Sequence, residues 1–534
     1  MLDRRSTDQI RSTRRGRVLR ASLAALLGIF SVTSFLPERA LAARLVPVGD
    51  EFTIRADDET KTHRAPTVAT EPGGGFVVIW HRNDDGDRSN RAQRFDGDGN
   101  FVGSGFEIGD AYRYPRTPSV AIDRNRDFLV AWSEGLSVYA RAGSLDGQTT
   151  GATFRVGGPG NSSQLDYGDT SRMPTVVATE PGRFVVAWSQ YYVGYPAAYL
   201  TTTTSTTSTT TTTTMGHILE RSFPRHQESP SESDVSLTRL LVEDGEIVAS
   251  SRVKLAWDSE YGRVADEFDD PRVALIGPGR IAAVWGRQGT LGTSIREVPE
   301  FERDGVLDLS LFEGGGYGLD LASGLHGDLV LAIEDSREGF LLAAFDRQAR
   351  PLSTALVLDL SSDDFAYGID IAKSAAGDTV AAWALYPGFS SVPADGDGLS
   401  IAARAFDCRL QSSAGEVVVN QAGAGDQGAP AVAVSESGTV MVVWETTGSS
   451  AEQRGVFGRL FRLTGGCSLC GDPSGDERIT ATDALMLLKM AVGGMQACPP
   501  EVCDVDDNGL VAASDALQVL IWSTGQPRQL RCPL

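Results

Sequence analysis

Short apolar strands separated by glycine-rich turns recur along residues 60–465. Each repeat starts at a proline or glycine, alternates apolar and other residues, turns through glycine or aspartate, and ends in an apolar run closed by tryptophan. The first repeat is Pro66–Ala69 followed by Gly75–Trp80. Apolar residues that alternate with period two, between Gly and Asp turns, predict strands joined in hairpins.

This pattern occurs seven times. Six of the eight tryptophans occupy its last position, and Ile333 replaces tryptophan in the fifth copy. Successive end positions are 52, 56, 97, 48, 50 and 61 residues apart. Most copies continue into a second hairpin, such as Ala92–Asp96 turning into Phe101–Val102. The seven end positions are Trp80, Trp132, Trp188, Trp285, Ile333, Trp383 and Trp444.

Four short strands in a repeated unit of about 50 residues are typical of a β-propeller, because one blade buries both faces of its sheet only when neighbours cover it. We therefore predict a mainly β fold, with a seven-bladed β-propeller over residues 43–465. Six blades, eight blades or an array of β-sandwiches are the alternatives. The repeated tryptophan predicts core packing worth about 2–3 kcal/mol per residue. A ring of sugar-stacking platforms is the alternative for it.

The spacing of 97 residues contains no further copy of the pattern. It contains instead a run of Thr and Ser at 201–214, followed by polar sequence. We interpret 201–234 as a low-complexity insertion in the third blade, since it has no apolar face to bury. Strand-like sequence resumes at Thr238–Val242. In an exported protein such a run is either an O-glycosylated spacer or an unmodified disordered segment.

Residues 1–42 have the pattern of a signal peptide. Seven arginines within Met1–Arg20 precede the apolar run Ala21–Val32, and Ala40-Leu41-Ala42 supplies a small-residue cleavage site. The run of 12 residues is too short to cross a hydrocarbon core of ~30 Å at ~1.5 Å per residue. We expect a secreted or cell-surface protein with no membrane span in the mature chain. A retained N-terminal anchor is the alternative, and Arg14-Arg15 leaves twin-arginine export open.

The charge balance is strongly acidic. Seventy Asp and Glu against 48 Lys and Arg give a formal net charge of -22. Nucleic acids and anionic membranes attract basic surfaces, so this balance argues against both as partners. It suits a protein that handles cations or neutral ligands such as carbohydrate.

Two acidic loops of twelve residues lie 32 residues apart, at 472–483 and 504–515. In calcium loops the ligands stand at positions 1, 3, 5, 7 and 12, and position 7 uses its backbone carbonyl. We predict two Ca²⁺ sites, the first weaker because Ser474 replaces an acid and Glu477 replaces the glycine of the turn. At position 8, Ile479 and Val511 are expected to pair the loops through a short strand. The predicted ligands are Asp472, Ser474, Asp476, Arg478, Asp483, Asp504, Asp506, Asn508, Leu510 and Asp515.

An apolar-periodic helix follows each loop, at Ala484–Leu488 and Ala516–Leu520. A loop followed by one helix, given twice, resembles a type I dockerin, and the resemblance covers residues 467–534. It implies a small α domain with two calcium loop–helix repeats that binds a cohesin-like protein through loop positions 10 and 11. The alternative is that Thr482 and Ser514 only cap their helices. The residues at positions 10 and 11 are Ala481, Thr482, Ala513 and Ser514.

The tail also holds five of the six cysteines, and Cys408 lies alone before it. An even number of cysteines in an exported chain predicts disulfides, here with 15 possible pairings. If all six pair, Cys408 must join the propeller to the tail. A zinc site is the alternative, although the tail has no histidine and one CxxC pair. The disulfide candidates are Cys408, Cys467, Cys470, Cys498, Cys503 and Cys532.

No catalytic residue is predicted. The five histidines are scattered, and neither a G-x-S-x-G nor an H-E-x-x-H motif is present. Acidic pairs such as Asp395 and Asp397 stand in glycine-rich turns, where aspartate favours local backbone bonds. Glycosidases need only two carboxylates, so a hydrolase stays open.

We therefore predict an exported, non-catalytic binding or assembly protein. Its propeller loops would bind a ligand, and its calcium-dependent tail would dock to a cohesin-like protein or a cell-surface component. One alternative is a glycoside hydrolase, or an accessory protein in polysaccharide catabolism, since dockerin tails usually accompany such enzymes. The other is a tail that acts only as a structural cap.

Overall fold

The computed structural model describes residues 43–534 with gaps. The predicted signal peptide, 1–42, and most of the Thr-rich insertion lie outside the described residues. The gaps are 57–60, 85–86, 111–117, 135–136, 147–148, 158–169, 193–230, 261–267, 278, 288–289, 298–301, 306–316, 325–326, 336–338, 347, 349, 353–355, 359–364, 387–397, 413–414, 424, 448–453, 468–469, 475–478, 494–497, 499, 525, 527–529 and 533–534.

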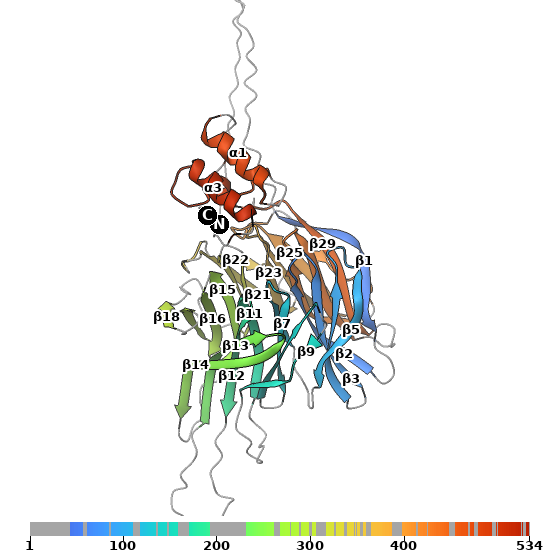
Figure 1. The fold of residues 1–534 in the computed structure, drawn as a ribbon. Coiled ribbons are helices and arrows are strands. Elements are labelled where there is room, and N and C mark those ends of the chain that lie inside the picture. The colour runs from blue at the N-terminus through green and yellow to red at the C-terminus, as the bar shows by residue number, and fades with distance from the viewer. Residues whose placement is uncertain are drawn as a thin grey trace, which may run out of the picture. The chain divides into compact units, whose positions relative to one another are not determined.

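Seven antiparallel sheets form the β part of the chain (Figure 1). The first strand of each sheet contacts the first strand of the next, and the seventh contacts the first, so these strands form a closed ring. A closed ring of seven sheets is a seven-bladed β-propeller, which confirms the predicted fold class and blade count. The ring strands are β2 (Lys61–Thr70), β6 (Ser119–Ile122), β11 (Thr170–Glu180), β15 (Phe268–Gly277), β19 (Tyr317–Ser323), β23 (Phe365–Lys373) and β27 (Asp426–Val434).

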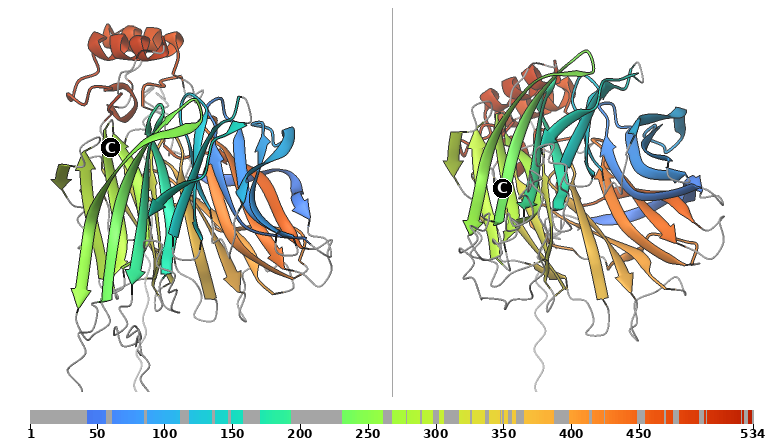
Figure 2. Two further views of the ribbon diagram at one scale, coloured as in Figure 1. Left: turned by 60° about the horizontal axis from the view of Figure 1, so that its bottom comes forward. Right: turned by 90° about the horizontal axis from the view of Figure 1, so that it is seen from below.

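The other strands extend each blade outwards from the ring (Figure 2). Blade 1 continues with β3 (Phe76–Asp84), β4 (Asp87–Phe95) and β5 (Phe101–Asp110). Blade 2 has β7 (Asp127–Glu134), β8 (Ser137–Ser144), β9 (Thr149–Thr150) and β10 (Phe154–Gly157). Blade 3 has β12 (Arg183–Tyr192), β13 (Ser231–Glu243) and β14 (Glu246–Glu260). Blade 4 has β16 (Arg280–Arg287), β17 (Thr290–Glu297) and β18 (Glu302–Gly305).

The last three blades follow the same plan. Blade 5 continues with β20 (Leu329–Asp335), β21 (Gly339–Phe345) and β22 (Leu356–Leu358). Blade 6 has β24 (Thr379–Tyr386), β25 (Ser400–Phe406) and β26 (Val417–Val418). Blade 7 has β28 (Thr439–Thr447) and β29 (Gly455–Thr464), and its outer strand is β1 (Arg44–Ala56) from the other end of the chain. The pairing of β1 with β29 therefore closes the ring by backbone hydrogen bonds.

The third blade accommodates the long spacing as a single sheet. β12 and β13 pair from Arg183↔Leu241 to Tyr192↔Glu232, although 38 residues separate them in sequence. The prediction of one blade with an insertion is confirmed. The insertion is shorter than predicted, because 231–234 already belong to β13, where buried Asp234 pairs with Arg252 and Lys254 of β14.

The repeated tryptophans lie in the core between blades. Trp383 packs with Val330 and Phe340 of blade 5, and Trp80 packs with Met441 and Val443 of blade 7. Each tryptophan thus covers the sheet of the preceding blade. The prediction of core packing is confirmed, and the alternative of sugar-stacking platforms is wrong because the rings are inaccessible. Four of the six are fully buried: Trp132, Trp188, Trp383 and Trp444.

Several aspartates hold the turns between strands. Asp123 accepts the N–H groups of Asn125 and Asp127, each at 2.9 Å, and Asp407 accepts that of Gln411 at 2.7 Å. These carboxylates accept local backbone hydrogen bonds, as aspartate in turns commonly does. Asp395 and Asp397 lie outside the described residues.

The tail contains α1 (Ala481–Ala491), α2 (Pro500–Cys503) and α3 (Ala513–Ser523) (Figure 1). The two longer helices include both predicted helical segments, and α1 contacts α3. Within the described residues, no helix has the length and apolar character needed to cross a membrane.

Candidate functional site

Each long helix of the tail begins at position 10 of an acidic loop, so that position 12 lies in its first turn. In both, the aspartate at loop position 12 accepts the N–H of the residue that precedes the helix. Asp483 accepts it from Thr480 at 2.8 Å, and Asp515 accepts it from Ala512 at 2.8 Å. The N-cap residues are therefore Thr480 and Ala512. Because Thr482 and Ser514 come two residues later, the alternative that they cap the helices is wrong.

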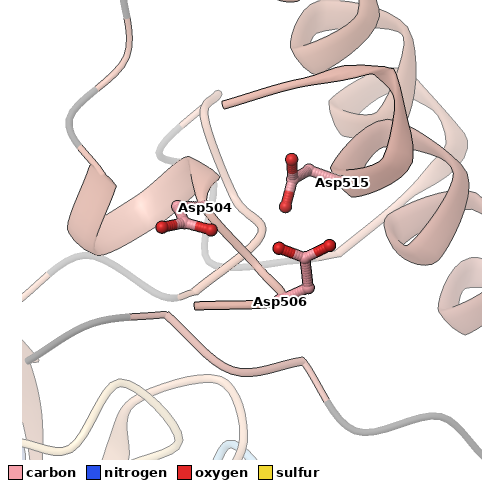
Figure 3. Close-up of side chains that lie close together, drawn as sticks. All are labelled: Asp504, Asp506 and Asp515. Atoms are coloured by element: carbon pink, nitrogen blue, oxygen red, sulfur yellow. The ribbon is translucent and has the colours of Figure 1, made fainter. Parts of the chain in front are cut away.

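Three carboxylates converge in the second loop (Figure 3). One oxygen each from Asp504, Asp506 and Asp515 lies within 4.8 Å of the other two. Asp504 and Asp506 come from the loop, whereas Asp515 comes from the first turn of α3. Asp504 and Asp515 are fully buried. Such a group of oxygens is the kind of donor set that a hard cation such as Ca²⁺ prefers.

Backbone hydrogen bonds fix the shape of this loop. Asp504 accepts the N–H groups of Asn508 at 3.0 Å and Gly509 at 2.8 Å. Gly509 has a φ of +84°, a left-handed conformation that glycine adopts without steric cost. Asn508 Oδ1 accepts the N–H of Leu510 at 2.9 Å, so the predicted ligands at positions 5 and 7 are neighbours within the same turn.

Of the three carboxylates, that of Asp506 has the fewest hydrogen-bond partners within the described residues. Among the described residues its buried Oδ1 has no hydrogen-bond partner, while Oδ2 accepts from Gln518 Nε2 at 3.2 Å. Burial, and then the charges of Asp515 and Asp504, raise the pKa of Asp506. A cation among the three carboxylates would offset this repulsion. The residues present therefore fit a divalent cation, and its identity as calcium stays a prediction.

The first loop is described in part. Ser474 Oγ donates to Asp472 at 2.8 Å, and the N–H of Ser474 lies 3.4 Å from Asp483 Oδ1, so these three predicted ligands lie together. Burial acts to raise the pKa of Asp483, but hydrogen bonds from Thr480 and Ser474 more than offset it, and the pKa is lowered. The predicted ligands Asp476 and Arg478 lie outside the described residues.

The four predicted partner-binding residues are all exposed, at the starts of the two helices: Ala481, Thr482, Ala513 and Ser514. Beside them lies an exposed apolar face, formed by residues of the two apolar-periodic segments that the sequence analysis predicted as helices. Leu485 and Leu488 of α1 are 51% and 42% exposed, and Leu517 and Leu520 of α3 are 57% and 43% exposed. The two pairs are 32 residues apart, as the loops are, and this shared offset was the signal that could have identified them.

The two apolar residues that were expected to join the loops pack instead into the core of the tail. Ile479 and Val511 pack against the cluster that contains Leu487 and Val519. Neither residue belongs to a strand or bridge in the described part of the tail. The predicted short strand is therefore wrong, and side-chain packing replaces it.

All six cysteines form disulfides, so the zinc alternative is wrong. Cys408, in the turn after β25, bonds Cys467, which follows β29, and this link joins the propeller to the start of the tail as predicted. Asp378 also accepts the N–H of Cys467 at 2.9 Å. Three disulfides indicate an extracytoplasmic protein. The other two bonds are Cys470–Cys532 and Cys498–Cys503.

A second group of charged residues lies on the inner ring of the propeller. Arg272, Asp320 and Asp370 occupy the same register position in blades 4, 5 and 6. Arg272 Nε lies 3.4 Å from Asp320 Oδ1. Each aspartate reaches the next blade, because Asp320 accepts the N–H of Ile371 and Asp370 that of Val432, both at 2.7 Å.

Burial is the main cause of the raised pKa of both aspartates. It raises the pKa of Asp320 despite the opposing charge of Arg272, and burial together with the charge of Asp320 raises that of Asp370 well above its usual range. The sequence analysis did not single out this pair. The sequence feature that could have identified the pair is an aspartate at the register position that Ser119 and Thr175 occupy in other blades.

No family description matches this chain, and no curated protein matches it. Among solved structures it is similar to a protein of unknown function from Dyadobacter fermentans, with 10% identity, 79% of this chain and 99% of the other covered, and a TM-score of 0.42. It is also similar to an α-L-arabinanase from Penicillium chrysogenum in complex with arabinobiose, with 10% identity, coverage of 78% and 98%, and a TM-score of 0.38. Likenesses this distant say nothing about the activity of this chain.

Proposed function

We propose that this chain is an exported binding protein whose tail, residues 467–534, docks to a partner in a calcium-dependent way. The convergence of Asp504, Asp506 and Asp515 carries the calcium part of the proposal. A carboxylate oxygen that is buried without a partner is costly, and a bound cation would satisfy it. The first loop would bind a second cation more weakly.

The exposed leucines support the docking part. Leu485 and Leu488 stand three residues apart on α1, so they lie on one face of the helix, and Leu517 and Leu520 repeat the arrangement on α3. Together with the exposed residues at loop positions 10 and 11 they form an apolar and hydroxyl-bearing surface. Apolar side chains that repeat on one face fit a protein partner, of which a cohesin-like domain is our proposal.

The cation dependence follows from how the helices are fixed. Asp515 belongs both to the carboxylate group and to the start of α3 through its bond to the Ala512 amide. A cation held by Asp515 would therefore fix the position of α3 and its leucines. Removal of the cation would leave three close carboxylates repelling one another, which loosens the loop and with it the docking face.

Calcium binding is tested first, on the full exported chain. Isothermal titration after chelator treatment should give one strong site, which Asp506→Asn removes or weakens strongly, and one weaker site. Asp98→Asn, at an exposed turn of the propeller, is the matched control and should leave both sites intact. Equal calcium affinity in the wild type and Asp506→Asn would refute the assignment of the second loop.

Docking is tested by affinity capture. The immobilised chain is exposed to the surface and secreted proteins of its own organism and eluted with a calcium chelator. We expect a cohesin-like protein that is lost when Leu485, Leu488, Leu517 and Leu520 are all changed to Ala. Val248→Ala, which removes an apolar side chain 51% exposed on the propeller, should retain it. A calcium-loaded tail that captures nothing would leave it as a structural cap.

A further inference from the structure

Two exposed tyrosines lie on the same face of blade 6. Tyr386 pairs with Phe365, and Tyr367 pairs with Ala384, across β24 and β23. Directly paired residues of an antiparallel sheet point to the same face, as do alternate residues of one strand. Tyr367 and Tyr386 are therefore diagonal neighbours, 40% and 51% exposed. Ala384 packs with Trp444 of blade 7, so this face is the one turned towards that blade.

A carboxylate of blade 7 reaches the same place. Asp426, the first residue of β27, accepts the N–H of Leu399 at 3.2 Å. Leu399 precedes Ser400, which pairs with Leu385, so Leu399 is level with Tyr386. Burial, and then the charges of Asp426 and Glu445, raise the pKa of Tyr367, as expected for carboxylates near its ring.

We propose that Tyr367, Tyr386 and Asp426 form a binding site for an organic cation, specifically an alkylammonium group. We call these three residues the tyrosine patch. The faces of aromatic rings attract cations through their quadrupole, most strongly for ammonium groups that carry little hydration. Asp426 adds a negative charge at an exposed position.

The surroundings favour a positive ligand over a neutral one. Within the described part of the chain, neither Asp426 nor Glu445 forms an ion pair, so their charge is not compensated by the protein. The net charge of -22 raises the local concentration of cations further. A neutral saccharide would use the rings but would gain nothing from this field, and a bare metal ion would gain little from the rings.

The proposal is independent of the docking role of the tail. It is tested by titrating the full exported chain with choline and with its uncharged isostere 3,3-dimethylbutan-1-ol, at low ionic strength, by isothermal calorimetry. We expect choline to bind at least about tenfold more tightly than the isostere. Added salt should weaken choline binding, because the carboxylate contribution is screened.

Variants assign the binding to the tyrosine patch. Tyr367→Ala, Tyr386→Ala and Asp426→Asn should each weaken choline binding by about fivefold or more, whereas Tyr367→Phe should retain it. Phe101→Ala, at a ring 53% exposed in blade 1, is the control and should have no effect. Circular dichroism and thermal unfolding confirm that each variant is folded. Equal binding of the two ligands, choline binding unchanged in the variants, no choline binding, or displacement of choline by neutral saccharides would each overturn the proposal.

Discussion

Replacing Asp370 with asparagine should stabilise the propeller at neutral pH. The carboxylate of Asp370 lies on the inner strand of blade 6 and accepts one hydrogen bond, from the Val432 amide of blade 7. The charged groups that face it are Asp320 from blade 5 and Arg272 from blade 4, and Arg272 lies against Asp320. The amide oxygen of asparagine can accept the same bond from Val432 without carrying the charge.

The size of the effect follows from what the substitution removes. It removes a partly buried negative charge that has no cation of its own and faces a second carboxylate. A buried charged group left without its partner costs roughly 1–3 kcal/mol or more. We therefore expect Asp370→Asn to raise the free energy of unfolding by about 1–3 kcal/mol at pH 7.5.

The sign of the pH dependence is fixed by the raised pKa. A folded pKa above the ordinary value of 3.8 means that the folded state binds more protons than the unfolded state once the pH exceeds that value. Wild-type stability from this group therefore falls as the pH rises through the window between 3.8 and the higher folded pKa. The advantage of Asp370→Asn should shrink as the pH is lowered and vanish below that window.

Urea unfolding followed by tryptophan fluorescence, at several pH values between 4 and 8, measures this difference. Asp98→Asn removes the same charge at an exposed turn and is the control, for which we expect a change close to zero. A less stable Asp370→Asn at pH 7.5 would show that the carboxylate is a net stabilising group. A gain that does not depend on pH would show that the charge is not its cause.

Three further predictions concern other contacts. Lys373→Ala should cost about 3–5 kcal/mol, because it leaves Asp328 buried without the cation that lies 2.7 Å away, and Lys373→Met with Asp328→Asn should recover most of it in urea unfolding. Cys467→Ser opens a disulfide between residues 59 apart and should lower the unfolding free energy by about 4 kcal/mol. Wild-type protein under reducing conditions should lose the same free energy only if the Cys408–Cys467 bond supplies most of the stabilisation by disulfides. Asp515→Ala removes the acceptor of the Val505 and Ala512 amides, so it should destabilise the tail by about 2 kcal/mol and abolish the stronger calcium site in titration, while Asp98→Asn, at an exposed turn of the propeller, should do neither.

The fold was predictable because the blade pattern is local. A strand buried on both faces needs an apolar run, and a turn needs glycine or aspartate, so most blades are formed by one continuous stretch of the chain. The closing contact of β1 with β29 was not predicted. It joins residues that are about 400 positions apart, and nothing in the sequence of Arg44–Ala56 identifies its partner strand.

The candidate sites were predictable to different degrees. The loop spacing predicted Asp504, Asp506 and Asp515, because ligands on one short loop are close in sequence as well as in space. The exposure of Leu485 and Leu517 was not predictable, since apolar periodicity alone does not show which side of a helix a neighbour covers. Asp320 and Asp370 come from different blades, and their juxtaposition depends on the ring.

The sequence by itself determined the seven blades, the insertion in the third, and the loop–helix order of the tail, since each depends on residues within one repeat. Only the tertiary structure decided which cysteines pair, that Asp370 faces Asp320, and that Tyr367 and Tyr386 share a face with Asp426. The Cys408–Cys467 bond, the pair Asp320 and Asp370, and the approach of Asp426 to the tyrosines each join residues from separate repeats. They depend on how the blades are packed, and packing is set by the shape of many side chains together rather than by any one segment.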